Sequence, residues 1–369
     1  MVSIPNPIDL ARKALEAAEE AAREAARKAE EVARETARIA EEAARKAEEV
    51  AREAADAVNI SKGVDYFVYL SGQNFQVKVS SPKKRRGQFS FQPKNSLVGK
   101  MQKGHREIAM FDIGAIEHSG RFEIAASKNG NSPLIEKYAE IAPSDGNLHG
   151  SDMGNMLQTP SIVTQDYSVS YGFYDAGVIE SHQAYIYVTD NYSNWMAQLF
   201  REMPALKKGS LELFVLPGSH DAGMFTGIVS DELVGALIKF IPGLNGLALS
   251  TAKRALINLA YTQKDNIKTQ LELGIRYFDF RPGYNLINID GILRHQHSFV
   301  PGYEFDKFLS DVVSFLKTHQ QEIVVVNIKY SGFARDDMKP SDQEVKSSID
   351  TALSGSGITK GNIDDLNKQ

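Results

Sequence analysis

The sequence predicts a multidomain chain: a long N-terminal α-helix, an all-β domain of the sandwich type and a C-terminal α/β domain. Three observations predict it. Residues 8–58 contain neither glycine nor proline, residues 60–192 hold short runs of alternating apolar and polar residues, and from about residue 195 apolar strands alternate with amphipathic helices. A chain of 369 residues is long enough for more than one core.

The composition excludes several classes of protein. A net charge of −5 gives no general attraction to nucleic acid. The absence of cysteine excludes disulfides, thiolate zinc sites and cysteine nucleophiles. No apolar run reaches transmembrane length, and the opening "MVSIPNPIDL" lacks the charged and apolar regions of a signal peptide.

Residues 1–58 are predicted to form the long helix. The segment "ARKAEEVARE" occurs at 26–35 and again at 44–53, 18 residues later, which is five turns of a straight α-helix. The helix would be roughly 75 Å long. Val32, Ile39 and Val50 form only a thin apolar stripe among alanines and charged residues. We therefore interpret this region as a spacer, a self-associating coiled-coil-like rod or an engineered fusion, without chemistry of its own.

Residues 59–194 are predicted to form an antiparallel β-sandwich that binds a membrane or a partner. "FQVKVS" places Phe75, Val77 and Val79 on one face, and "GRFEIAAS", "DYSVSYGFYD" and "QAYIYVTDN" follow between turn-forming segments. The tyrosines of these strands are interpreted as packing residues or as interface anchors: Tyr167, Tyr171, Tyr174, Tyr185 and Tyr187. The basic run Lys83, Lys84, Arg85 and Arg86 is either a solvated loop or a contact for anionic lipid.

Residues 195–369 are predicted to contain a parallel sheet covered by helices, either a Rossmann-like layer or a barrel. The predicted strands are 211–217, 275–281, 291–296 and 322–330, and the predicted helices are 233–241, 249–271, 304–319 and 341–353. No G-x-G-x-x-G follows any of these strands, so a dinucleotide site is not expected.

Titratable residues gather at the ends of the predicted strands, where parallel α/β folds place their reactive groups. They are His220 and Asp221, Asp279 and Arg281, His295 and His297, and Lys329. This set suits acid–base cleavage of a phosphodiester, with one histidine accepting a proton, a second donating one, and cations stabilising the phosphoryl oxygens. A metal site built from histidine and aspartate is the competing interpretation. Arg281, two residues beyond Asp279, argues against it because a guanidinium would supply the charge of the cation.

The segments "LPGSHDAG", "LELGIRYFDFRP" and "HQHSFVPGYEFDKFLSDVVSFLKTHQQEIVVVNIKY" resemble the X-region of phosphatidylinositol-specific phospholipase C in its bacterial, calcium-independent form. The resemblance covers about 195–353. It implies a TIM-type barrel that cleaves phosphatidylinositol through the inositol 2-hydroxyl, giving diacylglycerol and a cyclic inositol phosphate, with no cofactor and no metal.

The resemblance also implies roles for single residues. His220 matches the general base, Asp221 the carboxylate that supports the acid, and Arg281 the phosphate-stabilising arginine. His295 best matches the general acid. Because the family has glycine after that histidine where this chain has Gln296, nearby His297 keeps the assignment open.

Two further residues are implied to contact the substrate, and two departures from the family carry expectations. Lys329 matches a headgroup-binding lysine, and Asp279 lies where it can orient Arg281.

Only four barrel strands are predicted after Trp195, so we expect the first half of a barrel, truncated or completed by another chain, and this polypeptide alone could be inactive. The apolar insertion 232–260 is interpreted as a helix pair packed on the barrel or as a membrane-docking element, whose inserting residues would be Ile238, Phe240, Ile241 and Leu244.

The sequence therefore predicts a phospholipase C-type phosphodiesterase whose partners are a phospholipid surface and a phosphatidylinositol-like substrate. A catalytically inert membrane-binding or toxin-like module and an oligomeric fusion assembled through residues 8–58 are the alternatives. The family resemblance favours an extracellular or membrane-peripheral location.

Overall fold

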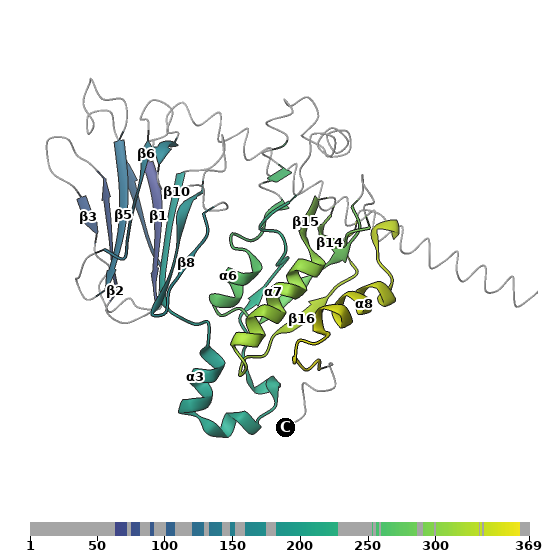
Figure 1. Cartoon of the computed structure of the whole chain (residues 1–369). Coiled ribbons are helices and arrows are strands. Elements are labelled where there is room, and N and C mark those ends of the chain that lie inside the picture. The colour runs from purple at the N-terminus through teal and green to yellow at the C-terminus, as the bar shows by residue number, and fades with distance from the viewer. Residues whose placement is uncertain are drawn as a thin grey trace, which may run out of the picture.

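The structure is a computed structural model, shown in Figure 1. The residues that it describes are 63–71, 75–81, 89–91, 101–107, 120–128, 133–141, 148–151, 159–174, 182–227, 253, 256–257, 260–285, 291–298, 300–331, 333 and 336–361. The predicted helix within 1–58, the basic run 83–86 and nearly all of the insertion 232–260 lie outside them. In the part of the chain that is described, no helix combines the length and apolarity needed to cross a membrane.

Two five-stranded sheets make up the N-terminal part of the described chain (Figure 1). The first has the order β4 (Gln102–Glu107), β1 (Gly63–Leu70), β10 (His182–Asp190), β9 (Tyr167–Tyr174) and β8 (Ile162–Val163). The second has the order β3 (Phe89–Phe91), β2 (Phe75–Ser81), β5 (Gly120–Lys128), β6 (Ile135–Ile141) and β7 (Leu148–Ser151).

The two sheets enclose one apolar core, which makes this part a β-sandwich. Alternate residues of β1, β2, β5 and β10 point inward, as the period of two dictates. Val68, Val77, Val169 and Val188 are completely buried between the sheets. The alternation predicted in "FQVKVS" is confirmed for Phe75 and Val77, which are both buried, while the side chain of Val79 lies outside the described ones. The expectation of a purely antiparallel sandwich is wrong in one place, because β1 and β10 pair in parallel.

A smaller parallel sheet forms the centre of the α/β part, with the order β11 (Gly218–Ser219), β12 (Tyr277–Phe280) and β16 (Val325–Ile328). Its helices are α6 (Ile267–Glu272), α7 (Phe305–Thr318) and α8 (Asp342–Leu353). Phe278 and Phe280 of β12 and Phe308 of α7 are buried in its core. A capping box between Ser341 and Glu344 starts α8.

One predicted parallel strand, 291–296, is antiparallel in the structure. Its strand is β14 (Arg294–His297), which pairs with β13 (Pro282–Gly283) on one side and β15 (Val300–Glu304) on the other. A parallel arrangement needs a crossover of about a dozen residues or more, and only residues 284–293 separate β13 from β14. In the α/β part, the described residues therefore contain three parallel strands and no closed barrel.

The predicted strand 211–217 is also wrong, because none of these residues lies in a strand. Leu211–Leu213 form a 3₁₀ turn, started by Ser210, whose side chain accepts a hydrogen bond from the Glu212 amide. Pro217 has no N–H to donate to a sheet, and pairing with β12 begins only at Gly218. Sheet pairing in this segment is therefore limited to the two residues directly before His220.

A buried ion pair joins the connecting helix α3 (Trp195–Glu202) to the α/β part. Arg276 Nε lies 2.8 Å from Glu322 Oε2, and both side chains are fully buried. Glu322 Oε1 accepts a hydrogen bond of 3.0 Å from the Ala197 amide, in the first turn of α3. Arg276 also donates to the Ser193 carbonyl at 2.7 Å. These contacts fix the end of the sandwich against the unit that carries the predicted site.

Candidate active site

The structure brings all seven predicted site residues together. Strands β11, β12 and β16 lie side by side in parallel, so the residues that follow them emerge at one edge of the sheet. His220 and Asp221 follow β11, Asp279 lies in β12 with Arg281 just beyond it, and Lys329 follows β16. His295 and His297 reach the same place from β14, two residues apart and therefore on one face of that strand.

Asp221 lies at the centre of the cluster. Its side chain is completely buried and its φ is +49°, a left-handed conformation that aspartate tolerates better than most residues. Burial by itself raises the pKa of this carboxyl, but the hydrogen bond from His295 and the charge of Arg281 outweigh it and hold the pKa below its usual value. Asp221 is therefore an ionised carboxylate around which the other groups are arranged.

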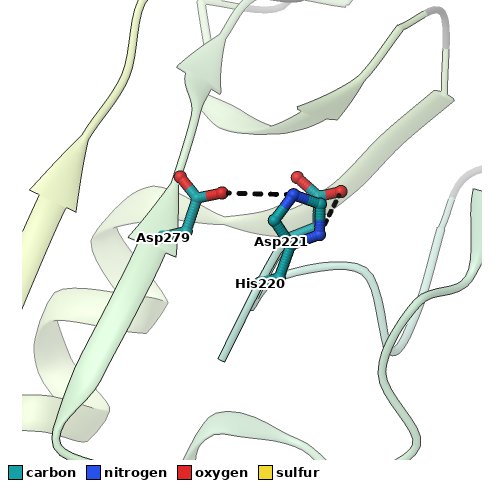
Figure 2. A group of neighbouring side chains, drawn as sticks. All are labelled: His220, Asp221 and Asp279. Carbon is teal, nitrogen blue, oxygen red and sulfur yellow. Dashed lines mark ion pairs between the residues drawn. The ribbon is translucent and has the colours of Figure 1, made fainter. Parts of the chain in front are cut away.

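His220 is the most accessible member of the cluster. Its side chain is 68% exposed, its Nδ1 lies 3.2 Å from Asp221 Oδ2, and its Nε2 lies 3.7 Å from Asp279 Oδ2. Figure 2 shows the imidazole between the two carboxylates. The Nε2 also lies 3.2 Å from Arg281 Nη2, which can only donate, so this nitrogen carries a lone pair. An exposed imidazole whose Nε2 is unprotonated is suited to accept a proton from a substrate hydroxyl.

The guanidinium of Arg281 occupies the position that a metal ion would need. His220, Asp221 and Asp279 each offer one ligand atom, and these atoms lie within 4.8 Å of one another. Arg281 Nη2 lies 3.0 Å from Asp221 Oδ1 and 3.3 Å from Asp279 Oδ2, in addition to its contact with His220. A cation placed among the three ligands would meet this positive charge directly. The donor set therefore fits a guanidinium better than a metal.

His295 is held on both sides of its ring. The backbone N–H of Arg281 donates to Nδ1 at 3.3 Å, and Nε2 faces Asp221 Oδ1 at 3.4 Å. An Nδ1 that accepts a hydrogen bond cannot carry a proton, so the proton of the neutral ring is on Nε2 and points at Asp221. The side chain is fully buried, and burial lowers the pKa of this imidazole although Asp221 opposes the shift. His295 is thus a neutral hydrogen-bond donor to Asp221.

His297 faces the same carboxylate from a more open position. Its Nε2 lies 3.6 Å from Asp221 Oδ2, and its side chain is 32% exposed. Burial lowers its pKa, Asp221 raises it, and the positive charge of Arg281 lowers it further. This imidazole can reach a substrate that His295 cannot touch.

Asp279 and Lys329 form the far side of the cluster. Lys329 Nζ lies 3.3 Å from Asp279 Oδ1, and the lysine side chain is 40% exposed while that of Asp279 is almost fully buried. The lysine ammonium therefore stays accessible beside a fixed carboxylate.

Three further polar residues support the cluster by holding the backbone of the turn 220–222. Each donates a side-chain hydrogen bond to a carbonyl of the turn that carries the first two site residues. They are Thr262, Gln263 and Gln270, which contact the carbonyls of Asp221, His220 and Ala222. No motif marks these residues, because their role depends on where the segment 261–270 lies in space.

Comparisons with known proteins agree with the predicted resemblance. No protein-family model matches the chain. PI-PLC X domain-containing protein 1 of Danio rerio is 24% identical over 137 residues, which cover 37% of this chain and 43% of that protein. PI-PLC X domain-containing protein 2 of Homo sapiens is 30% identical over 139 residues, covering 37% and 43%. A PI-PLC X domain-containing protein of Dictyostelium discoideum is 34% identical over 129 residues, covering 34% and 20%.

Solved structures of phosphatidylinositol-specific phospholipase C from Staphylococcus aureus are also similar to this chain. Two of them show 20% and 22% identity with TM-scores of 0.31 and 0.32, and the match covers 47% of this chain and 47% of the first structure, and 48% and 50% for the second. TM-scores this low carry no argument about the fold. The chain spans less than half the length of the curated relatives it matches. The resemblance of this chain to the phosphatidylinositol-specific phospholipase C X-region is confirmed.

Proposed function

We propose that the α/β part is a metal-independent phosphodiesterase of the phospholipase C type. Its substrate would be phosphatidylinositol or a related phospholipid, cleaved to diacylglycerol and a cyclic inositol phosphate. The observation that carries the proposal is the convergence of His220, Arg281 and His297 around the buried Asp221. Two accessible imidazoles and a guanidinium on one carboxylate are the groups that acid–base attack on a phosphodiester requires.

The reaction would proceed by two proton transfers. His220 Nε2 accepts the proton of a substrate hydroxyl, whose oxygen then forms a bond to phosphorus. The phosphorus–oxygen bond to the glycerol breaks, and the leaving oxygen takes a proton from a protonated histidine. Arg281 stabilises the charge on the phosphoryl oxygens.

We assign the proton donor to His297 rather than to His295. A general acid must reach the leaving oxygen, and the fully buried His295 has both ring nitrogens engaged by Arg281 and Asp221. His295 instead holds Asp221 in place by donating from Nε2. Lys329 and Asp279 would bind hydroxyls of the headgroup. The sandwich would then bring the site to a lipid surface or to a partner.

The test is a cleavage assay on vesicles that contain phosphatidylinositol, in the presence of EDTA. We expect cyclic inositol phosphate from the full chain and none from His220→Ala, whose substitution removes an exposed side chain and should leave the fold intact. His319→Ala is the matched control, because His319 lies at the end of α7, stacked on Phe315. Parallel vesicles of phosphatidylcholine test the headgroup. Absence of product from the full chain, or product that EDTA abolishes, would contradict the proposal.

A further inference from the structure

The segment 261–266 connects the sandwich to the site. On the sandwich side, Ser161 directly precedes β8 and donates twice to Asp265, the residue before the N-cap of α6. Its backbone N lies 2.7 Å from Oδ1 and its hydroxyl 2.7 Å from Oδ2. Asp265 is only 7% exposed, and Lys264 Nζ lies 3.2 Å from the Ser161 hydroxyl. A buried carboxylate that accepts two such bonds makes a strong and directional contact.

On the site side, the same segment and α6 hold three successive carbonyls of the turn 220–222. The bonds are Gln263 Nε2 to His220 O at 2.7 Å, Thr262 Oγ1 to Asp221 O at 3.4 Å, and Gln270 Nε2 to Ala222 O at 3.1 Å. Gln270 Nε2 also donates to the Asp265 carbonyl at 2.6 Å. Asp265, which accepts the hydrogen bonds from the sandwich, is therefore hydrogen-bonded through its carbonyl to Gln270, and Gln270 in turn holds the Ala222 carbonyl of the turn.

The turn needs support from outside because it has little regular structure of its own. Strand β11 contains only Gly218 and Ser219, and pairing stops before His220. Asp221 then adopts a left-handed backbone conformation, which persists only where the surroundings hold it. Here the turn is held by hydrogen bonds from the side chains of Thr262, Gln263 and Gln270. The Ala222 amide also donates a hydrogen bond of 3.0 Å to the Asp279 carbonyl.

We propose that the contact between Ser161 and Asp265 positions the reacting groups: the sandwich holds the segment 261–266, and this segment holds His220 and Asp221 in the geometry that the reaction needs. The proposal rests on the proposed function for its effect on catalysis. Neither Ser161 nor Asp265 touches the substrate in this arrangement, so both act through the turn. The sandwich is thus a structural part of the site as well as a separate β domain.

A kinetic test uses the full chain with Ser161→Ala and Asp265→Ala. We expect kcat to fall about tenfold while KM stays within about twofold, because the groups that bind the headgroup are unchanged and only the reacting groups shift. Ser161→Thr, which keeps the hydroxyl, should restore kcat. The matched control is Ser71→Ala, which removes another sandwich hydroxyl, one that lies 3.2 Å from Tyr192 and makes no contact with the segment 261–266. Unchanged kcat in both test variants would overturn the proposal.

Hydrogen exchange gives a second readout that does not depend on activity. The amides of Ala222 and Met224 bond to the carbonyls of Asp279 and Asp221, at 3.0 and 2.9 Å. In Asp265→Ala we expect these two amides to exchange at least about fivefold faster, with the amides of α7 unchanged. Unchanged exchange, or faster exchange throughout the chain, would overturn the positioning role. If the wild-type chain forms no cyclic phosphate, the proposed function fails while the exchange data still decide whether the sandwich holds the turn.

Discussion

The sandwich and the α/β part differ in what they bury. Among the described residues of the sandwich, the buried ones are apolar or aromatic, with Gln102 and Ser168 as polar exceptions. Every buried aspartate, glutamate, arginine and histidine among the described residues lies in the α/β part. They are Asp221, Asp265, Arg276, Asp279, Arg294, His295 and Glu322.

This difference separates a unit that is stabilised mainly by packing from a unit whose stability is tied to its charges. Burying an ion costs several kcal/mol unless a partner and hydrogen bonds offset it. For Asp221, Asp279 and His295 the partners are also groups of the candidate site, so substitutions there should change folding, pH dependence and chemistry together. In the sandwich, a core substitution should change stability alone.

The largest effect is expected at the buried ion pair. Glu322→Ala should lower the free energy of unfolding of the α/β part by about 3–5 kcal/mol, because it leaves the Arg276 guanidinium buried without its carboxylate. It also removes the acceptor for the Ala197 amide. Denaturant titration measures the change. Asp350→Ala is the control: its side chain is 48% exposed and both of its partners, Lys346 and Lys360, are exposed as well, so a much smaller loss is expected. Equal losses in both variants would contradict the prediction.

The second effect concerns the packing of the turn against β14. A Cβ at Gly223 would lie 2.5 Å from His295 Cβ, closer than side chains approach one another. Gly223→Ala should therefore displace the turn and lower the rate of phosphodiester cleavage by about 100-fold. Gly218→Ala is the matched control, since its new Cβ would meet Tyr277 at an ordinary 3.5 Å. A Gly223→Ala variant with wild-type activity would show that the turn does not need this contact.

The third prediction separates the two histidines of β14 by their pH dependence. The pKa of His297 is lowered from the ordinary 6.5 by burial and by Arg281, so a protonated His297 is lost as pH rises through a value below 6.5. We expect kcat/KM to fall on the alkaline side from that point. His297→Asn should lower kcat by about 100-fold and remove this limb of the profile. A limb that disappears in His295→Asn and persists in His297→Asn would reverse the assignment of the proton donor.

The smallest effect is a loss of stability in mild acid, confined to the α/β part. Burial lowers the pKa of His295 below 6.5 in the folded state. At pH values between that lowered pKa and 6.5, the unfolded chain therefore binds more protons than the folded chain. Stability therefore falls as pH decreases through this window, and the lowered pKa of Asp221 adds a further loss below 3.8. Melting temperatures recorded from about pH 8 to about pH 5 should show a slope that is shallower in His295→Asn. The prediction would be contradicted if the melting temperature of the sandwich changed with pH as steeply as that of the α/β part.

Much of this protein could be predicted from local sequence patterns. The alternation in 75–80 predicted β2 and its buried face, and the amphipathic segment 304–319 predicted α7. The seven candidate site residues were found as polar residues at strand ends and in motifs, and all seven lie in one cluster. Such patterns work because side-chain periodicity and strand-end position depend on the chain's own geometry.

What the sequence did not determine is which segments pair, and which atoms each side chain meets. The parallel pairing of β1 with β10, the antiparallel position of β14 and the support from Thr262, Gln263 and Gln270 all join residues far apart in the chain. His295 and His297 lie two residues apart in β14 and both face Asp221, yet the His295 side chain is fully buried and the His297 side chain is 32% exposed. His295 packs against the ring of Phe280 and beside Gly223, and these contacts come from other strands and turns, because burial is a property of the assembled surfaces and not of either strand alone.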